Sequence, residues 1–328
     1  MRDVGLLKCD EPFRRLLTQG MVLNEIFYRH PEGGRISYYN PVDVEIKSDA
    51  KGQRSGAVLK ADGKPVQSGG IGTMSKSKNN GVDPQSLIER YGADTARFFM
   101  MFASPPEQTL EWSDTGVEGA YRFLKRLWAF CAENKTSIEA HNTTNKDLSL
   151  PWEKAPDVIK NVRREIHSLL KQANFDFDKY QFNTVASACM KMLNVLERNL
   201  GSMMSMSVTP GNYGWKLLEE SLSILLRVLS PLTPHISDTL WQELGYGEDI
   251  LAAPWPEPDA AALVRDEIEL VVQVNGKLRG KVTVAADAAR EEIESEALAN
   301  ENVGRFVSGR EIKKIIVVPR RLVNIVVA

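Results

Sequence analysis

Apolar residues in the middle of the chain recur with helical spacing. Between residues 113 and 134, one stripe follows steps of three and four: Val117, Tyr121, Leu124, Trp128 and Cys131. The stretches 159–173, 186–200 and 218–229 repeat this spacing, and a fifth begins at Pro234. Stripes of this kind predict amphipathic helices that bury one face. Together they predict an α-helical bundle over residues 113–256.

The pattern changes after the proline-rich stretch 253–258. Two apolar runs, 270–274 and 277–282, are joined by Asn275-Gly276, the strongest short-range signal for a β-hairpin. A helix is predicted over 290–299, followed by strands over 312–318 and 322–327. The sequence therefore predicts a small α+β domain of order ββαββ over residues 264–328.

The first third mixes both patterns. A short helix over about 11–19 and a strand over 20–23 are predicted, and alternation within 36–66 predicts small antiparallel hairpins. Asp83-Pro84 predicts a helix start, with Asp as N-cap and Pro at the first helical position. Asp94 or Thr95 is expected to cap the next helix. Thr233 is expected to cap the helix that begins at Pro234, and His235 is expected in the core.

Composition limits the alternatives. At 328 residues and a net charge of −2, the chain can hold two or three domains and has no global field that would attract nucleic acid. Any RNA contact must therefore use local basic patches. The cysteines, Cys9, Cys131 and Cys189, lack metal-ligand spacing and are expected to be buried, reduced thiols of a cytoplasmic protein. Neither a transmembrane run nor a secretory signal is found.

One stretch, residues 69–81, concentrates candidate chemistry. Its glycines permit bending, and Lys76 and Lys78 alternate with Ser75, Ser77 and amide side chains. A mobile cationic loop that leads into a helix suits a polyphosphate ligand. The alternative is a solvated surface loop of the same composition.

The order of residues in this stretch resembles a family signature. Met74-Ser75-Lys76-Ser77, followed by residues 78–84 and 91–97, is similar to the second signature of class I aminoacyl-tRNA synthetases, Lys-Met-Ser-Lys-Ser. The rest of the chain resembles the bacterial type of leucyl-tRNA synthetase. Thr73 departs from the pattern, because it stands where the family has the first lysine. The main catalytic role would therefore fall to Lys76.

The resemblance implies a domain layout. Residues 1–35 would end a Rossmann-like α/β catalytic domain, 36–68 would be a small β-rich leucine-specific insert, and 69–112 would hold the signature loop and a helical connector. Residues 113–256 would be the anticodon-binding bundle, and 264–328 a tRNA-binding domain. ATP would contact Met74, Ser75, Lys76, Ser77, Gln19 and Gly20. For Gln19, a polar residue at a loop end is an equal alternative.

Two basic surfaces are candidates for tRNA contact. Arg122, Lys125 and Arg126 share one helix face. The final domain carries Lys277, Arg279, Lys281, Lys313, Lys314, Arg320 and Arg321, whereas its predicted helix is acidic. In both places, a solvated basic face is the alternative. Neither surface is expected to have an aromatic stacking platform beside it, so recognition of the RNA backbone and shape is expected.

The first class I signature, His-x-Gly-His, does not occur, and the histidines at 30, 141, 167 and 235 are isolated. The resemblance therefore implies the C-terminal part of an enzyme that activates leucine with Mg²⁺-bound ATP and transfers it to tRNA(Leu). Such a segment is expected to be inactive alone, monomeric and without a metal site of its own. Two alternatives remain: a non-catalytic tRNA-binding protein and a synthetase of the isoleucyl or valyl type.

Overall fold

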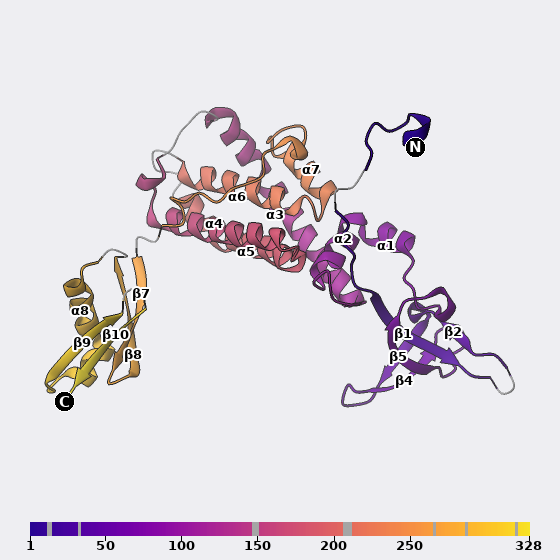
Figure 1. Ribbon diagram of the computed structural model, residues 1–328, viewed down its shortest axis with the longest axis horizontal. Helices are drawn as coiled ribbons and strands as arrows, with labels where there is room; N and C mark the ends of the chain where they lie inside the picture. The colour runs from indigo at the N-terminus through magenta and orange to yellow at the C-terminus, as the bar shows by residue number, and fades with distance from the viewer. Residues whose placement is uncertain are drawn as a thin grey trace. The chain divides into compact units, whose positions relative to one another are not determined.

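The computed structural model describes residues 1–11, 15–31, 34–145, 151–205, 212–264, 267–285, 288–318 and 321–328 (Figure 1). The chain forms two compact units, Met1–Asp259 and Ala260–Ala328. The first unit combines β-sheets with a set of helices, and the second is a four-stranded sheet with two helices. No helix in the described ranges is long and apolar enough to cross a membrane.

The first sheet is built around strand β1, Val22–Arg29. Strands β2 (Ser37–Tyr39) and β5 (Gln67–Thr73) pair with it antiparallel, and the two-residue β6 (Leu110–Glu111) pairs with it parallel. The strand predicted at 20–23 begins two residues later than expected. The predicted preceding helix is wrong for residues 15–19, which are irregular, while residues 12–14 lie outside the described residues. Among the residues described before β1, the regular element is a short 3₁₀ turn, Arg2–Val4.

A separate hairpin follows β2. After the 3₁₀ turn Pro41–Asp43, strand β3 (Val44–Ser48) pairs antiparallel with β4 (Arg54–Leu59). Its apolar side chains pack with the β1 sheet in a small buried cluster of Phe27, Val44, Ala57, Leu59 and Val66. The predicted hairpin is thus confirmed, and it lies against the sheet that carries the signature loop.

The helices of the first unit occupy most of the positions that the apolar stripes predicted. Their bounds are α1 Pro84–Tyr91, α2 Ala93–Phe102, α3 Asp114–Asn145, α4 Asp157–Asp178, α5 Phe182–Ser205, α6 Tyr213–Leu229 and α7 Pro234–Glu243. Short 3₁₀ turns at Trp152–Lys154 and Ile250–Ala252 flank the longer helices. The connection expected over 201–214 is shorter at both ends, because α5 runs to Ser205 and α6 starts at Tyr213. Residues 206–211 lie outside the described part.

One continuous apolar core joins α2 to α7. Leu127, Ile159, Leu193 and Leu225 are among its fully buried members. The stripe predicted on α3 is partly wrong, because Trp128 remains 44% exposed. Leu127 and Phe123 are buried in its place, so the buried face of α3 is rotated slightly from the predicted one.

The second unit has a mixed sheet of order β8-β7-β10-β9. Its strands are β7 Glu267–Val274, β8 Lys277–Ala285, β9 Ile312–Val318 and β10 Leu322–Val327. The helix predicted at Arg290–Ala299 is present as α8, but a second helix, α9 (Glu301–Val307), follows it. The order is therefore ββααββ, not ββαββ. Asn275 and Gly276 both adopt positive φ, 48° and 76°, as the predicted hairpin turn requires.

Candidate functional site

The signature loop is anchored where β5 ends. The backbone N–H of Met74 donates to the Val22 carbonyl at 3.1 Å, which places the loop beside the start of β1. Ser75 then caps a 3₁₀ turn, Lys76–Lys78, by accepting from the Lys78 N–H at 3.3 Å. Asn79 ends this turn in the left-handed conformation, with φ of 48°. The loop is therefore a defined turn, whereas the sequence predicted a freely bending one.

Asn80 is the polar centre that holds this turn, and it is fully buried. Its side-chain oxygen accepts from the Ser75 N–H at 2.8 Å, and its carbonyl accepts from the Asn24 amide at 3.0 Å. Its own amide faces the carbonyls of Asn24, Gly72 and Thr73 at 3.4 Å. A buried polar group must be paired in this way to be tolerated. The sequence signal for this anchor is the adjacent Asn79-Asn80 pair within residues 69–81.

The glycines before the loop serve packing more than mobility. Gly69, Gly70 and Gly72 lie in strand β5, which corrects the expectation of a flexible flank. A Cβ atom at Gly72 would lie 2.8 Å from the Ile26 side chain, and one at Gly69 would lie 3.2 Å from it. These positions therefore let β5 lie close under Ile26 on β1.

The cations of the loop differ in exposure. Lys76 is exposed next to the Ser75 and Ser77 hydroxyls, which lie 3.2 Å from each other. Lys78 is half-buried and folds back toward Gly72. Thr73, at the end of β5, is exposed. Of these residues, Lys76 is thus the cation that a ligand from solution can reach.

The structure brings Gly20 close to the second half of the connector. Its N–H donates to the Pro106 carbonyl at 2.8 Å, and a Cβ atom there would lie only 2.0 Å from the Gln108 carbonyl oxygen. No side chain fits at this position. Gly20 therefore positions the start of β1, and with it the base of the loop, against residues 106–111. Gln19 is exposed and irregular, so its proposed contact with ATP stays a prediction.

Helix α2 connects the loop region to α7, the last helix of the first unit. The Asp94 carboxylate accepts from the Ile236 N–H at 2.7 Å and from His235 Nδ1 at 2.9 Å. It thus caps α7, the role that had been predicted for Thr233, whose side chain makes no cap bond. Asp94 was expected to cap its own helix, but Gly92 occupies that position. The predicted core position of His235 is also wrong, because its side chain is 74% exposed.

Arg97 adds a second bond at this junction. Its guanidinium donates to the carbonyls of Pro231 and Leu232 at 2.9 and 3.1 Å. These carbonyls lie in the turn between α6 and α7. Helix α2 is therefore fixed to the start of α7 by two of its side chains, the carboxylate of Asp94 and the guanidinium of Arg97.

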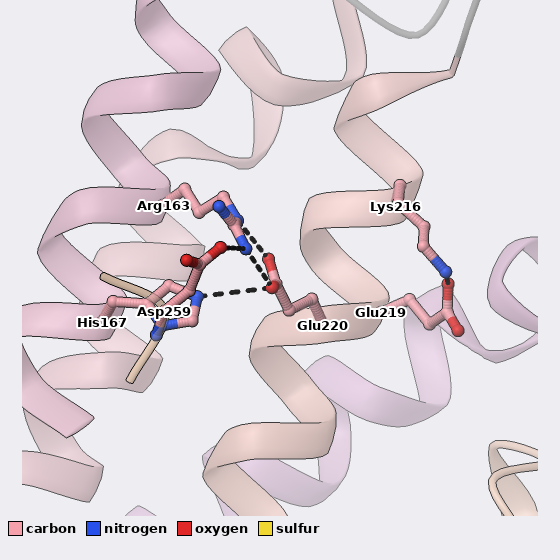
Figure 2. Close-up of polar contacts among 6 residues, drawn as sticks. All are labelled: Arg163, His167, Lys216, Glu219, Glu220 and Asp259. Carbon is pink, nitrogen blue, oxygen red and sulfur yellow. Dashed lines mark hydrogen bonds and ion pairs between the residues drawn. The ribbon is translucent and has the colours of Figure 1, made fainter. Parts of the chain in front are cut away.

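A partly buried ion cluster links α4, α6 and the segment after α7 (Figure 2). Arg163 is 5% exposed and forms a two-point contact with Glu220, with both N···O distances at 2.8 Å. It also donates to Asp259 at 2.8 Å and stacks on the Trp152 ring at 4.3 Å. His167 lies between Glu220, 3.3 Å away, and the Asp259 N–H, which donates to Nδ1 at 3.0 Å. The cluster holds three separate segments together.

The electrostatics of Glu220 follow from this geometry. Burial alone would raise the pKa of its carboxyl group, but the hydrogen bonds and positive charge of Arg163, with the hydrogen bond of His167, outweigh burial. The pKa of Glu220 is therefore lowered from its ordinary value of 4.5. This arrangement keeps Glu220 ionised, which suits a structural clamp.

The basic face predicted on α3 is partly used within the protein. Arg126 donates to Glu197 at 2.5 Å and to Asn194 at 2.6 Å. Lys125 lies over the Tyr121 ring at 5.4 Å. Arg122 shares the helix face but has no such acid partner within the described ranges. The ion pair with Glu197 explains how cations can cluster here without any RNA.

The basic residues of the second unit also divide into two groups. Lys281 pairs with Glu269 on β7 at 2.7 Å, whereas Arg279 lies over the Phe306 ring at 3.8 Å. The remaining predicted side chains, Lys277, Lys313, Lys314 and Arg321, are exposed. Arg320 lies outside the described residues. The contact between Arg279 and Phe306 was missed in the sequence, where no aromatic residue lies near Arg279.

Burial also corrects the prediction for the thiols. Cys131 and Cys189 are buried and free, but Cys9 is exposed. Burial raises the pKa of Cys131 to about 12 and raises that of Cys189 further. Neither buried thiol is therefore a nucleophile at neutral pH.

Two parts of the chain match known protein families. Residues 59–113 match the family described as "tRNA synthetases class I (I, L, M and V)", and residues 160–295 match "Anticodon-binding domain of tRNA ligase". The first range holds the signature loop and the connector, and the second holds most of the helices. The chain thus belongs to the class I aminoacyl-tRNA synthetases.

Individual relatives narrow the assignment. Leucine–tRNA ligases of Bordetella petrii and Bordetella pertussis are 54% and 55% identical over 99% of this chain, and that of Burkholderia pseudomallei is 54% identical over 100%. The chain spans about 36% of the length of these curated relatives. It corresponds to a segment of leucine–tRNA ligase that covers the end of the catalytic part and the anticodon-binding domain.

A solved structure shows the same fold. A leucyl-tRNA synthetase from Agrobacterium radiobacter, crystallised as a ternary complex with tRNA and LeuAMS, is 25% identical with a TM-score of 0.64. The match covers 100% of this chain and 34% of that one. The ligands in that crystal belong to the relative, and no contact in this chain follows from them directly.

Proposed function

We propose that this chain supplies a leucine–tRNA ligase with the cationic loop of its ATP site and with surfaces that bind tRNA(Leu). The observation that carries the proposal is the anchored turn 74–80, in which buried Asn80 fixes the base and Lys76 stays exposed. The high identity to leucine–tRNA ligases favours leucine over the isoleucyl and valyl alternatives. Mg²⁺ would arrive with ATP, and the protein would act as a cytoplasmic monomer.

The role of Lys76 follows from its charge. When the leucine carboxylate attacks the α-phosphorus of ATP, negative charge grows on the departing pyrophosphate. An exposed ammonium on a turn whose base is rigid stabilises that charge without reorganisation. The Ser75 and Ser77 hydroxyls would add donors beside it.

The test uses the full-length enzyme that contains these residues. We expect Lys76→Ala to lower the adenylation rate by about 10²–10³-fold, the usual cost of losing one such donor, with a much smaller effect on leucine binding. Thr73→Lys should be neutral or mildly activating, because it restores the charge typical of the family. Lys51→Ala, in the exposed β3–β4 turn, is the matched control. An unchanged rate in Lys76→Ala would remove the proposed role.

The chain alone is expected to be inactive. It has no His-x-Gly-His sequence to contribute to the ATP site. Purified residues 1–328 should therefore show no leucine-dependent exchange between pyrophosphate and ATP. Robust exchange would show that this segment carries a complete site. Without exchange, tRNA binding decides whether the chain also functions as a non-catalytic RNA-binding protein.

The RNA proposal is tested by salt dependence. Binding of folded tRNA should be measurable at low salt and weaken steeply toward physiological salt, because counterions are released from each neutralised phosphate. Reversing the charges of Lys277, Arg279 and Lys281 should make the plot of log affinity against log salt shallower. Reversing the glutamates of α8 should not. If both variants follow the parent, the basic residues are only a solvated surface.

A further inference from the structure

Strand β8 contains a β-bulge at Arg279. On β7, Val272 pairs with Gly280, and the next residue, Gln273, pairs with Leu278. Arg279 is thus an extra residue that has no partner on β7. A bulge turns one side chain away from the direction that regular alternation would give it. Arg279 therefore does not continue the alternating pattern of Lys277 and Lys281, with which the sequence had grouped it.

The bulge is held in place by the junction between α8 and α9. Asn300 donates from its amide to the Lys281 carbonyl at 3.0 Å. Its side-chain oxygen accepts from the N–H groups of Asn302 and Val303 and thereby caps α9. A Cβ atom at Gly280 would lie 2.8 Å from that oxygen, so only glycine fits there. One asparagine thus fixes both the bulge and the helix that faces it.

This arrangement stacks the Arg279 guanidinium on Phe306 of α9, with 3.8 Å from the guanidinium carbon to the ring centroid. Its Nε atom is buried without a hydrogen-bond partner. The two terminal nitrogens are not among the buried atoms that lack a partner, and within the described residues no acceptor bonds to them. They therefore remain open to solvent. A buried, unpaired Nε is unfavourable, so the side chain is not placed for its own hydrogen bonding.

We propose that Arg279, fixed by Phe306, is a preorganised anchor for a backbone phosphate of folded RNA. The inference rests on the proposed function. It names the residue by which the second unit would fix the orientation of a bound RNA phosphate. A guanidinium held flat presents a planar fork of donors, which matches two phosphate oxygens at once. Stacking removes rotational freedom before the ligand arrives, so less is lost on binding.

The surroundings favour an anion of this kind. Arg305 and Arg310, on and after α9, add two cations to this region, and Glu301 and Glu311 flank them. Lys281, in contrast, is paired with Glu269. Phosphate oxygens on a folded RNA are spaced and oriented by the duplex. A single rigid fork therefore positions the RNA without reading its sequence.

The proposed anchor depends on the stacked plane of the Arg279 guanidinium, so lysine at this position should not restore RNA binding. An ammonium on a flexible stem is a point charge without the fork, and it stacks less well on an aromatic ring. We expect R279Q to weaken binding of folded tRNA by the whole chain by about tenfold, the cost of a charge-assisted bond. R279K should stay within about twofold of R279Q, although it keeps the charge.

The experiment measures tRNA affinity of the 328-residue chain against salt for the parent and four variants. Phe306→Leu keeps the arginine and most of the apolar volume, and we expect a several-fold loss of affinity. Arg290→Gln is the matched control, expected within about twofold of the parent, because the Arg290 guanidinium pairs with Glu294 on α8 at 2.7 Å. R279Q should also make the salt slope shallower by roughly 0.7–0.9. Thermal unfolding of each variant shows whether it is folded at the temperature of the measurement.

The outcomes separate this inference from the function on which it rests. A parent chain that fails to bind folded tRNA at low salt overturns both. A parent that binds, with R279Q unchanged, overturns only the anchor. If R279K binds tRNA like the parent, the stacked geometry is not needed, and the positive charge at residue 279 alone explains binding. Polyglutamate that competes as well as tRNA at equal charge would assign the site to an acidic protein instead.

Discussion

Replacing Glu220 by glutamine should destabilise the helices of the first unit far more than the same change one residue earlier. Glu220 accepts two hydrogen bonds from Arg163 and one contact from His167 (Figure 2). Glu219, the matched control, pairs with Lys216 within the same helix at 3.0 Å. Both substitutions keep shape and length and remove one charge. Their environments therefore decide the difference.

The magnitude follows from the contacts. Hydrogen bonds to charged groups contribute about 1.5–3 kcal/mol, and neutral ones about 0.5–1.5 kcal/mol. One of the two bonds from Arg163 becomes a bond to a neutral acceptor, and the other is lost, because one carboxylate oxygen is replaced by an NH₂ group that repels the donor. Since Arg163 keeps Asp259 and Trp152, we expect Glu220→Gln to cost about 2–3 kcal/mol of unfolding free energy. Glu219→Gln should cost less than about 0.5 kcal/mol, as partly exposed pairs within a helix do.

The assay is thermal unfolding followed by circular dichroism of the helices. For a unit of this size, about 1 kcal/mol corresponds to about 2–4 °C, so the Glu220→Gln midpoint should fall by about 4–12 °C. Equal shifts in both variants would refute the reasoning.

The same cluster gives the sign of a pH effect. The pKa of Glu220 is lowered in the folded protein, so its contribution is fully present above pH 4.5 and is lost as pH falls through the lower folded value. Glu220→Gln should lack this part of the acid sensitivity. An identical acid limb of the stability profile in parent and variant would contradict the assigned shift.

Further predictions concern packing and thiols. Gly20→Ala should destabilise the contact of β1 with residues 106–111 by about 1–3 kcal/mol, because its Cβ would lie 2.0 Å from the backbone carbonyl oxygen of Gln108, whereas Gly56→Ala, with open space around it, should be nearly neutral in urea unfolding. Of the free thiols, Cys9 should react rapidly with a thiol reagent in the native protein, and Cys131 and Cys189 should react only after unfolding. Rapid reaction of all the thiols would show that the helical core opens.

Local rules predicted much of the fold. The Asn275-Gly276 turn, the strands that follow α8 and the proline start of α7 were all correct, because each depends on residues within a few positions of one another. The helix expected over residues 11–19 was wrong for residues 15–19, because these residues are exposed and bury no apolar face that would stabilise a helix. Helix α9 was missed because it is short and its cap, Asn300, directly follows another helix.

The sequence predicted which residues belong to the candidate site, but it did not predict their geometry. Lys76 and its serines were found from their order in sequence, but the buried role of Asn80 depends on Asn24, 56 residues away. Pairing of Arg126 with Glu197 likewise joins separate helices. A row of cations in sequence does not show which of them already have partners.

The cap that Asp94 provides for α7 has a consequence for the order of folding. Asp94 and Ile236 are 142 residues apart, whereas α4, α5 and α6 pack against their neighbours in sequence. Contacts that close long loops form after local ones, because the entropy of closure must be met first. The α4–α6 hairpins should therefore form early, and α7 should acquire its fixed first turn only when α2 docks. Slow and fast phases in refolding, with the slow phase abolished by Asp94→Ala, would reveal that order.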